Sequence, residues 1–479
     1  MSFVSIEFLL FLPVVFLLYW FVFKPLRWQN ALVLVASYMF YGWWDWRFLG
    51  LIALTSACSF GSGLLIKHYE GRQNLQKAVS AINIIINIGI LAVFKYFNFF
   101  VDSLEQLLGT FGYTLDLPTA HIILPVGISF YTFQALSYSI DVYKGKLEPT
   151  RNIVAFFAFI SFFPQLVAGP IERATNLLPQ FLSPRRFDYA KAVDGSRQML
   201  WGFFKKMVIA DGCAVVVNSV WGDYAHQSAL NMAIACLLFS FQIYCDFSGY
   251  SDIAIGCARL FGINLMCNFK YPYFARNIPE FWRRWHISLT SWFRDYVYIP
   301  LGGNRVSRWR TVVNTLVVFA ISGLWHGANW TFVAWGAYHG ILISLFVVVM
   351  GKSRYKVETS LTRLIPTFRE LAAMLVTLVL VVFGWLLFRS PSLGDAVGYV
   401  CQMFTAPLST GVIVGKWQLL LCLALLVVEW LSRGCEHPLQ FSKSGLLSMR
   451  WVRWTLYVLL ALLAILWQAP SQDFIYFQF

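Results

Sequence analysis

Charged residues are scarce in this sequence. Asp, Glu, Lys and Arg together make up 13% of its 479 residues, whereas soluble globular proteins carry about 25%. Hydrophobic residues make up 58% and the mean hydropathy is +0.63, which excludes a single soluble domain and an intrinsically disordered chain. The class of protein that remains is a polytopic membrane protein. The 18% share of Phe, Trp and Tyr fits that class, because aromatic side chains favour the bilayer interface.

The sequence also lacks the patterns of a disulfide framework or a metal site. Its nine cysteines are scattered, most of them inside apolar stretches, and no two form a C-x-x-C pair. They are expected to be buried small hydrophobic residues. Walker, G-x-S-x-G and H-E-x-x-H motifs are missing as well. We therefore expect no metal cofactor.

The charges that are present are mostly basic. Lys and Arg number 37 against 23 acidic residues, a formal net charge of +14. These basic residues stand between apolar runs and form no single patch, which indicates cytoplasmic loops that meet anionic lipid headgroups. Nucleic-acid-binding motifs are missing, so no nucleic acid is expected as a partner.

Long apolar runs predict an all-α fold with roughly 10–12 transmembrane helices, some of them re-entrant or interfacial. We detect no repeat between the two halves, no linker and no low-complexity tract, so residues 1–479 are interpreted as one membrane domain and an inverted-repeat transporter gains no support. Basic residues flank the first and last runs on the expected cytoplasmic side, which predicts that both chain ends lie outside. Clear runs begin near residues 6, 48, 79, 152, 229, 311, 372, 412 and 454, and weaker candidates cover 31–44, 121–141, 198–220 and 331–350.

Residues 270–310 form the longest segment outside these runs, and this segment is both basic and aromatic. Pro279 before Glu280 is typical of a helix N-terminus. We predict a single interfacial helix with an aromatic face turned inward and a cationic face turned toward water or a polar ligand. The aromatic face would carry Phe281, Trp285, Leu289, Trp292 and Tyr296, and the cationic face Arg283, His286, Thr290 and Arg294.

Two histidines are candidates for chemistry. His326 follows an apolar run and stands among Gly and Trp in SGLWHGANW, where a desolvated imidazole stays neutral and is able to accept a proton. Its structural alternative is a hydrogen bond to a neighbouring helix. His286 lies on the cationic face, where an ordinary interfacial role is the alternative. His339 lies about 220° from His326 on one helix, so the two share a site only if the helix breaks, and we expect a structural role for His339.

Two carboxylates stand inside an apolar run. Asp246 and Asp252 are six positions apart, about 240° on a helix, so they are not expected to form a catalytic pair. A kink or a polar cavity lining is the expected role.

Five segments together resemble one family, the membrane-bound O-acyltransferases, and within it the bacterial subgroup of the alginate O-acetyltransferases. The resemblance covers nearly the whole chain, and the combination of F-W-R-R-W-H with W-H-G is its most specific part. The segments are LPVGISFYTFQALSYSIDVYKG (124–145), YCDFSGYSDIAIG (244–256), YFARNIPEFWRRWHISLTSWFRDYVYIPLGG (273–303), SGLWHGANWTFVAWGAYHG (322–340) and the tail FIYFQF (474–479).

This resemblance implies a many-helix bundle around a central funnel, with His326 as the catalytic histidine and His286 at the second signature position. It implies acetyl-CoA as the donor. Arg283, Arg284 and Arg294 would bind its phosphates, with simple contact to lipid headgroups as the alternative. Tyr476 in the tail would relay the acyl group, and its alternative is an interfacial anchor.

The resemblance further implies acetylation of a cell-envelope polysaccharide such as alginate, cellulose or peptidoglycan, by way of periplasmic partner proteins at the bacterial inner membrane. D-alanyl transfer to teichoic acid is an alternative within the family. It is disfavoured because those systems generally carry the aromatic tail on a separate small protein. A polytopic transporter and a non-catalytic scaffold of an exopolysaccharide machine are the alternatives of another class.

Overall fold

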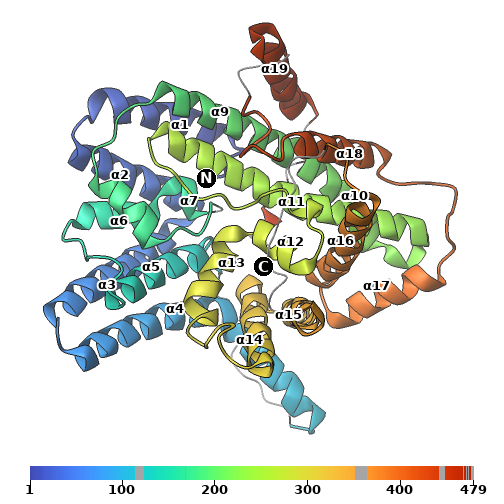
Figure 1. The fold of residues 1–479 in the computed structure, drawn as a ribbon, viewed down its shortest axis with the longest axis horizontal. Coiled ribbons are helices and arrows are strands. Elements are labelled where there is room, and N and C mark those ends of the chain that lie inside the picture. The colour runs from blue at the N-terminus through green and yellow to red at the C-terminus, as the bar shows by residue number, and fades with distance from the viewer. Residues whose placement is uncertain are drawn as a thin grey trace. The chain divides into compact units, whose positions relative to one another are not determined.

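The computed structural model describes residues 1–113, 123–167, 169–350, 364–441, 448–467, 469–470, 472 and 474–475. In these residues the regular structure is helical throughout (Figure 1). The chain divides into two compact units: residues 1–195 with 254–266, and residues 196–253 with 267–479.

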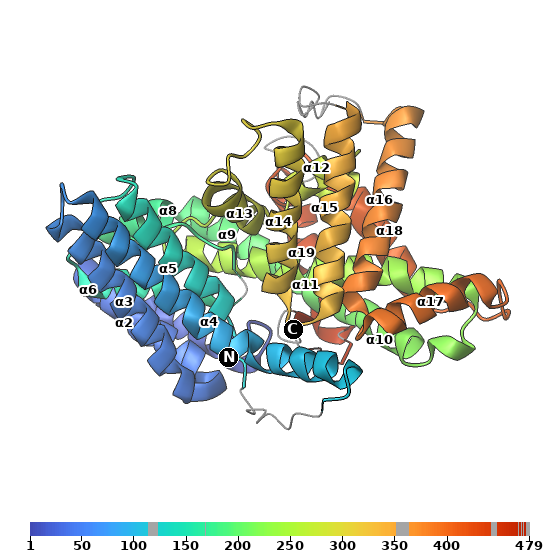
Figure 2. The same ribbon diagram turned by 90° about the horizontal axis from the view of Figure 1, so that it is seen from below.

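The first unit is a set of packed helices. α3 packs against α4 and α5, while α2 packs against α6 (Figure 2). Helix α5 is buried along nearly its whole length, and Gly63 of α3 leaves room for the ring of Tyr138 on α5. The helices are α1 (Ile6–Leu17), η1 (Leu18–Val22), α2 (Leu26–Asp45), η2 (Trp46–Phe48), α3 (Leu49–His68), α4 (Gln73–Thr110), α5 (Ile128–Tyr143), α6 (Ile153–Ser161), α7 (Phe163–Leu166) and α8 (Ala174–Leu182).

The second unit holds the aromatic core around the candidate histidines. It takes in α9 (Tyr189–Phe204) from Ser196 onward and α11 (Ala229–Leu260) as far as Ile253. α14 packs closely along α15, and α15 packs on α16 (Figure 2). The remaining helices are η3 (Lys205–Ala210), α10 (Asp211–Gly222), η4 (Tyr224–His226), η5 (Pro272–Phe274), α12 (Ile278–Arg284), α13 (Ile287–Phe293), η6 (Arg294–Tyr298), α14 (Arg308–His326), α15 (Trp330–Met350), α16 (Phe368–Arg389), α17 (Leu393–Thr405), α18 (Lys416–Leu431) and α19 (Arg450–Leu466).

Five helical stretches in the described residues are long and apolar enough to cross a membrane, the first of them made of α2, η2 and α3 together. Large apolar side chains stay exposed along them, as Ile85 (68%) on α4 and Val379 (67%) on α16 show, which suits contact with lipid. The prediction of an all-helical membrane protein is therefore confirmed, while the count of roughly 10–12 spans stays a prediction. The five are Leu26–His68, Gln73–Thr110, Ala229–Leu260, Trp330–Val349 and Phe368–Arg389.

The single interfacial helix predicted across residues 280–296 is wrong. The chain forms α12, breaks at His286 and resumes as α13, and η6 follows with π-helical geometry. His286 itself adopts a left-handed backbone with φ 42°, which costs a non-glycine residue about 1–3 kcal/mol. The aromatic face nevertheless points inward as predicted, because Phe281 and Trp285 are each only 1% exposed.

Candidate active site

His326 is the last residue of α14. The helix stops there because the chain turns at Gly327, where an added Cβ would collide with the ring of Phe332, and α15 begins three residues later. The imidazole is 4% exposed. Its ring centroid lies 5.0 Å from that of Trp335 and 5.5 Å from that of Phe388, both in edge-on contact. The side chain therefore stands in a dry, aromatic pocket of the second unit.

His286 is held by Asn268. The His286 Nδ1 and Asn268 Oδ1 atoms are 3.0 Å apart, and the backbone N–H of Ile287 donates to the Asn268 carbonyl oxygen at 2.9 Å. The hydroxyl of Ser288 donates to the same Asn268 Oδ1 at 2.9 Å, while Asn268 Nδ2 donates to Ser251 at 3.1 Å. These contacts with His286 and the two residues that follow it stabilise the left-handed backbone of His286. Sequence reasoning missed Asn268, which stands alone in a loop and carries no motif.

The same contacts set the tautomer of His286. Because the amide oxygen Asn268 Oδ1 only accepts hydrogen bonds, His286 Nδ1–H donates to it, which places the imidazole lone pair on Nε2. His286 lies outside the spanning helices, and its burial lowers its pKa to about 3. The ring is therefore neutral near pH 7.

The two histidines predicted from the sequence come together. The centroids of the His286 and His326 rings are 6.5 Å apart, and the two side chains are 1% and 4% exposed. Two imidazoles at this distance can both reach one small reacting group placed between them.

His339 also lies nearby, since the helix does break between His326 and α15. Its Nδ1 accepts from Trp282 Nε1 at 3.4 Å, and its ring packs 5.3 Å from Trp335. A Cβ added at Gly384 would sit 2.5 Å from His339 Nε2. These tight contacts on several sides fit the structural role expected for His339.

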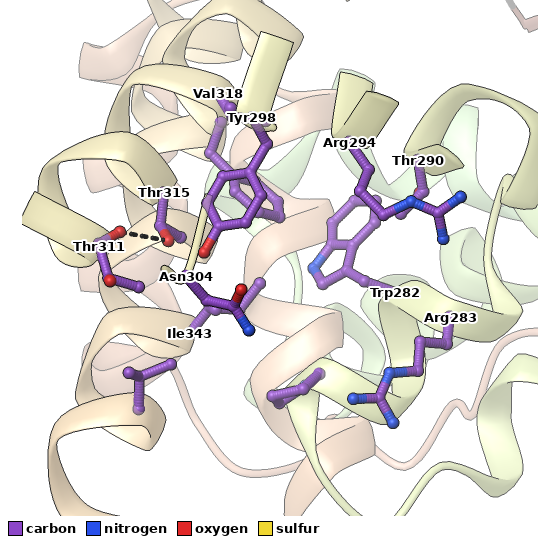
Figure 3. Close-up of a pocket in the computed structure, with 13 residues that line it drawn as sticks. Trp282, Arg283, Thr290, Arg294, Tyr298, Asn304, Thr311, Thr315, Val318 and Ile343 are labelled. Atoms are coloured by element: carbon purple, nitrogen blue, oxygen red, sulfur yellow. Dashed lines mark hydrogen bonds between the residues drawn. The ribbon is translucent and has the colours of Figure 1, made fainter. Parts of the chain in front are cut away.

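The predicted phosphate-binding arginines occupy two different environments. Arg283 and Arg294 line a cavity of about 300 Å³, and Figure 3 shows them with Trp282 on one side of it, across from Tyr298 and Asn304. Arg284 is absent from the residues that line this cavity.

Arg284 is held by a buried ion pair, whereas the ion pair of Arg294 with Asp295, at 2.7 Å, is exposed. The Arg284 guanidinium contacts Glu280 at 2.8 Å and donates to the Lys270 carbonyl oxygen at 3.4 Å. Glu280 is 1% exposed, so this ion pair is largely removed from water.

The cavity is separated from His326 by indole rings. Trp282 lines the cavity and its ring lies 5.6 Å from Trp335, which in turn contacts His326 at 5.0 Å. Two indole rings in edge-on contact thus stand between the arginines and the imidazole.

Asp246 and Asp252 bind different lysines, as expected for residues that do not form a catalytic pair. Asp252 pairs with Lys205 at 2.6 Å and Asp246 with Lys206 at 2.8 Å. Sequence reasoning missed both lysines, although two consecutive lysines in the apolar run WGFFKKMVIA were a usable signal, because lysine is seldom buried without a partner.

Tyr476, the predicted relay residue, lies outside the described residues. The residues just before it are described: Phe474 is fully buried and Ile475 is 3% exposed. In the parts of the chain that the structure describes, no group of three or more His, Cys, Asp or Glu side chains is placed to hold a metal ion.

Two buried imidazoles side by side in an all-helical membrane protein are suited to general acid–base chemistry, as in integral-membrane group-transfer enzymes. A family model described as the membrane-bound O-acyltransferase family matches residues 150–383. The chain is 40% identical over 396 residues to a probable alginate O-acetylase of Azotobacter vinelandii, covering 83% of this chain and 76% of that protein. A probable alginate O-acetylase of Pseudomonas aeruginosa is 39% identical over 411 residues, covering 86% of this chain and 74% of its own length.

A peptidoglycan O-acetyltransferase of Helicobacter pylori is 35% identical over 419 residues, covering 81% of this chain and 76% of that protein. The chain belongs to the membrane-bound O-acyltransferase family, and it is an O-acyltransferase. The family resemblance derived from the sequence motifs is confirmed.

Proposed function

We propose that this protein transfers acetyl groups from cytoplasmic acetyl-CoA, across the inner membrane of a bacterium, to a cell-envelope polysaccharide by way of a periplasmic partner protein. The observation that carries the proposal is the buried pair His286 and His326, with ring centroids 6.5 Å apart. The 35–40% identity to alginate and peptidoglycan O-acetylases supports acetyl transfer and a glycan acceptor.

His326 acts as the general base in this proposal. Its neutral imidazole takes the proton of an attacking hydroxyl as the oxygen forms a bond to the thioester carbonyl carbon, and the C–S bond then breaks to release the CoA thiolate. The proton returns from the imidazolium to that thiolate. His286, fixed by Asn268, accepts a hydrogen bond through Nε2 and orients the hydroxyl. The dry surroundings of both rings keep water from competing as acceptor.

The first acceptor is Tyr476. A phenol with a pKa near 10 is a weak nucleophile at pH 7 and needs a base such as His326. The phenolic ester then carries the acetyl group toward the partner protein and the polysaccharide.

The donor phosphates bind Arg283 and Arg294 at the cavity. Guanidinium groups suit phosphate because they donate two parallel hydrogen bonds. For the thioester to reach His326, the rings of Trp282 and Trp335 must part, so we propose Trp282 as a gate between the donor cavity and the base. The ion pair with Glu280 leaves Arg284 in a supporting role.

Acetyl transfer from radiolabelled acetyl-CoA tests the proposal, with the purified full-length protein in detergent. We expect His326→Gln to lower the rate of label transfer by about 10²–10⁴-fold, the usual contribution of a general base. His339→Gln is the matched control, because it removes a second buried imidazole of the same core, and it should keep a rate close to wild type per folded molecule. Equal losses in both variants, or full activity in His326→Gln, would remove His326 from the mechanism.

A further inference from the structure

Two consecutive lysines are buried in the second unit. Lys205 and Lys206 begin the π-helical segment η3 and are 3% and 0% exposed. Burying an ammonium group is costly unless it is paired and hydrogen-bonded, and π-helical turns in helices are often found at functional sites. Lys205 meets this need within its own surroundings, through Asp252 at 2.6 Å and Ser248 Oγ at 2.8 Å.

Lys206 meets the same need in a different way. Its Nζ contacts Asp211 Oδ1 at 2.7 Å and Asp246 Oδ1 at 2.8 Å, and it donates to the backbone carbonyl oxygen of Gln472 at 2.9 Å. An ammonium group has three N–H donors. Two are used by the carboxylates and the third by the terminal segment of the chain, so this buried cluster is completed only when that segment is in place.

Asp246 binds the same segment through a second backbone atom. Its Oδ2 accepts the backbone N–H of Ile475 at 2.7 Å, while its Oδ1 faces Lys206. The cluster carries two carboxylates against one ammonium, so an additional N–H donor from the backbone stabilises the second carboxylate. Both contacts are made to backbone atoms, and side-chain identity in the terminal segment is not needed for them.

Aromatic packing fixes the segment further. The ring of Phe474 lies 4.5 Å from that of Tyr250 and 5.7 Å from that of Phe247. The ring of Phe247 also contacts His286: the two ring centroids lie 4.6 Å apart, in edge-on contact. The terminal segment therefore packs against a side chain that also forms a wall of the histidine site.

We propose that Lys206 and Asp246 form a docking site for Gln472 and Ile475 and act as positioning residues that bring the following residue, Tyr476, to the histidine site. The docking itself stands on the contacts above, and its consequence for acyl transfer rests on the proposed function. The site recognises the backbone, through one carbonyl oxygen and one N–H, together with one aromatic side chain.

Hydrogen exchange of the Ile475 amide, measured by mass spectrometry on the terminal peptide of the full-length protein in detergent, tests the docking. In wild type this N–H should be protected. Asp246→Asn weakens the acceptor of the Ile475 N–H, and Lys206→Met removes the hydrogen bond to the Gln472 carbonyl oxygen. Each variant should speed exchange across the terminal peptide on the order of tenfold or more, since hydrogen bonds to charged groups are stronger than those between neutral groups. An unprotected wild-type amide, or unchanged protection in both variants, overturns the proposal.

A second variant avoids disturbing the buried charges. Ile475→Pro removes the backbone N–H that Asp246 binds and fixes φ, and Ile475→Ala is its control because it also loses the Ile side chain but keeps that N–H. We expect faster exchange at the neighbouring amides of the terminal peptide in the proline variant and much smaller change in the alanine variant. The same exchange in both would overturn the role of Asp246.

Labelling of Tyr476 by acetyl-CoA separates this inference from the proposed function. Loss of label in Ile475→Pro, together with loss of protection, supports the positioning role. Label retained at the wild-type rate on an unprotected segment overturns it. If wild type shows protection and no label, the docking is supported while the tyrosine relay of the proposed function fails.

Discussion

The Nδ1 atom of His286 lies 3.0 Å from Oδ1 of Asn268, and this contact decides both the tautomer and the backbone of the histidine. Asn268 binds the chain at the start of α13, through the Ile287 N–H, while the N–H of the nearby Lys270 donates to the Arg284 carbonyl oxygen at the end of α12. A catalytic ring on a strained residue needs such support, because a small error in its position lowers the rate strongly. Asn268 is therefore a positioning residue of the site, which holds His286 and contacts no substrate in the proposed mechanism.

Replacing Asn268 tests this relationship. In Asn268→Ala, His286 loses its hydrogen-bond acceptor, and we expect kcat for acetyl transfer to fall by about tenfold to a hundredfold with KM for acetyl-CoA unchanged. Asn87→Ala is the control, since Asn87 is equally buried, at 0% exposure, in the first unit. Both variants should lower the thermal midpoint, and only Asn268→Ala should lower kcat. A normal kcat in Asn268→Ala would contradict the positioning role.

The two neighbouring arginines should differ in donor binding. Arg283→Gln removes a guanidinium from the cavity, and we expect KM for acetyl-CoA to rise by about tenfold or more, as for loss of a charged hydrogen bond. Arg284→Gln removes an equal charge from the adjacent position, where Glu280 holds it, and should leave KM unchanged. Steady-state kinetics at two salt concentrations measures both. Equal rises in KM would mean that general surface charge attracts the donor.

Acid should destabilise the protein partly through His286. Burial holds the folded pKa of His286 at about 3, below the value of about 6.5 in an unfolded chain. Between these two values the unfolded state binds the proton, so stability falls as pH falls below about 6.5 and is unaffected by this group at higher pH.

Thermal unfolding from pH 7.5 to 4.5 measures this effect. The decline in the wild-type midpoint should be less steep in His286→Asn, by an amount that corresponds to at most about 1.4 kcal/mol per pH unit. His226→Asn removes an exposed imidazole (side chain 82% exposed) and serves as the control. Its thermal midpoint should decline with falling pH as steeply as that of wild type. Parallel curves for wild type and His286→Asn would show that His286 titrates normally.

Gly384 should be intolerant of a side chain. A Cβ there would sit 2.5 Å from His339 Nε2, and His339 has no room to move because Trp282 and Trp335 pack on it at 5.1 and 5.3 Å. We expect Gly384→Ala to destabilise the fold by about 1–3 kcal/mol, as overpacking usually does.

The matched control is Gly212→Ala in α10, where no atom lies within 4 Å of the added Cβ. Replacing a helical glycine by alanine in open space is neutral or stabilising by about 0.4–1 kcal/mol. Thermal midpoints of both variants in the same detergent measure the difference, and equal midpoints would show that the core around His339 adapts to the added methyl group.

The sequence by itself determined the class of protein and most of its helices. Its low charge content and its apolar runs dictate spanning helices, since a backbone in lipid must satisfy its own hydrogen bonds. Every clear run predicted from the sequence contains helix, from α1 at Ile6 to α19 at Arg450, although the run near residue 152 forms the two short helices α6 and α7 and no single long one. The motifs around His286 and His326 indicated the family together with three further segments, because F-W-R-R-W-H and W-H-G are specific in combination.

Only the tertiary structure decided how these pieces form a site. Apolar periodicity reports local geometry, so it predicted an unbroken helix through His286, and the hydrogen bonds from Asn268 overrule that preference. The contact from Asp246 to the Ile475 N–H spans 229 positions and the contact from Lys206 to Gln472 spans 266. Such pairs carry no local pattern. They arise because a buried charge must find partners wherever the packed chain provides them.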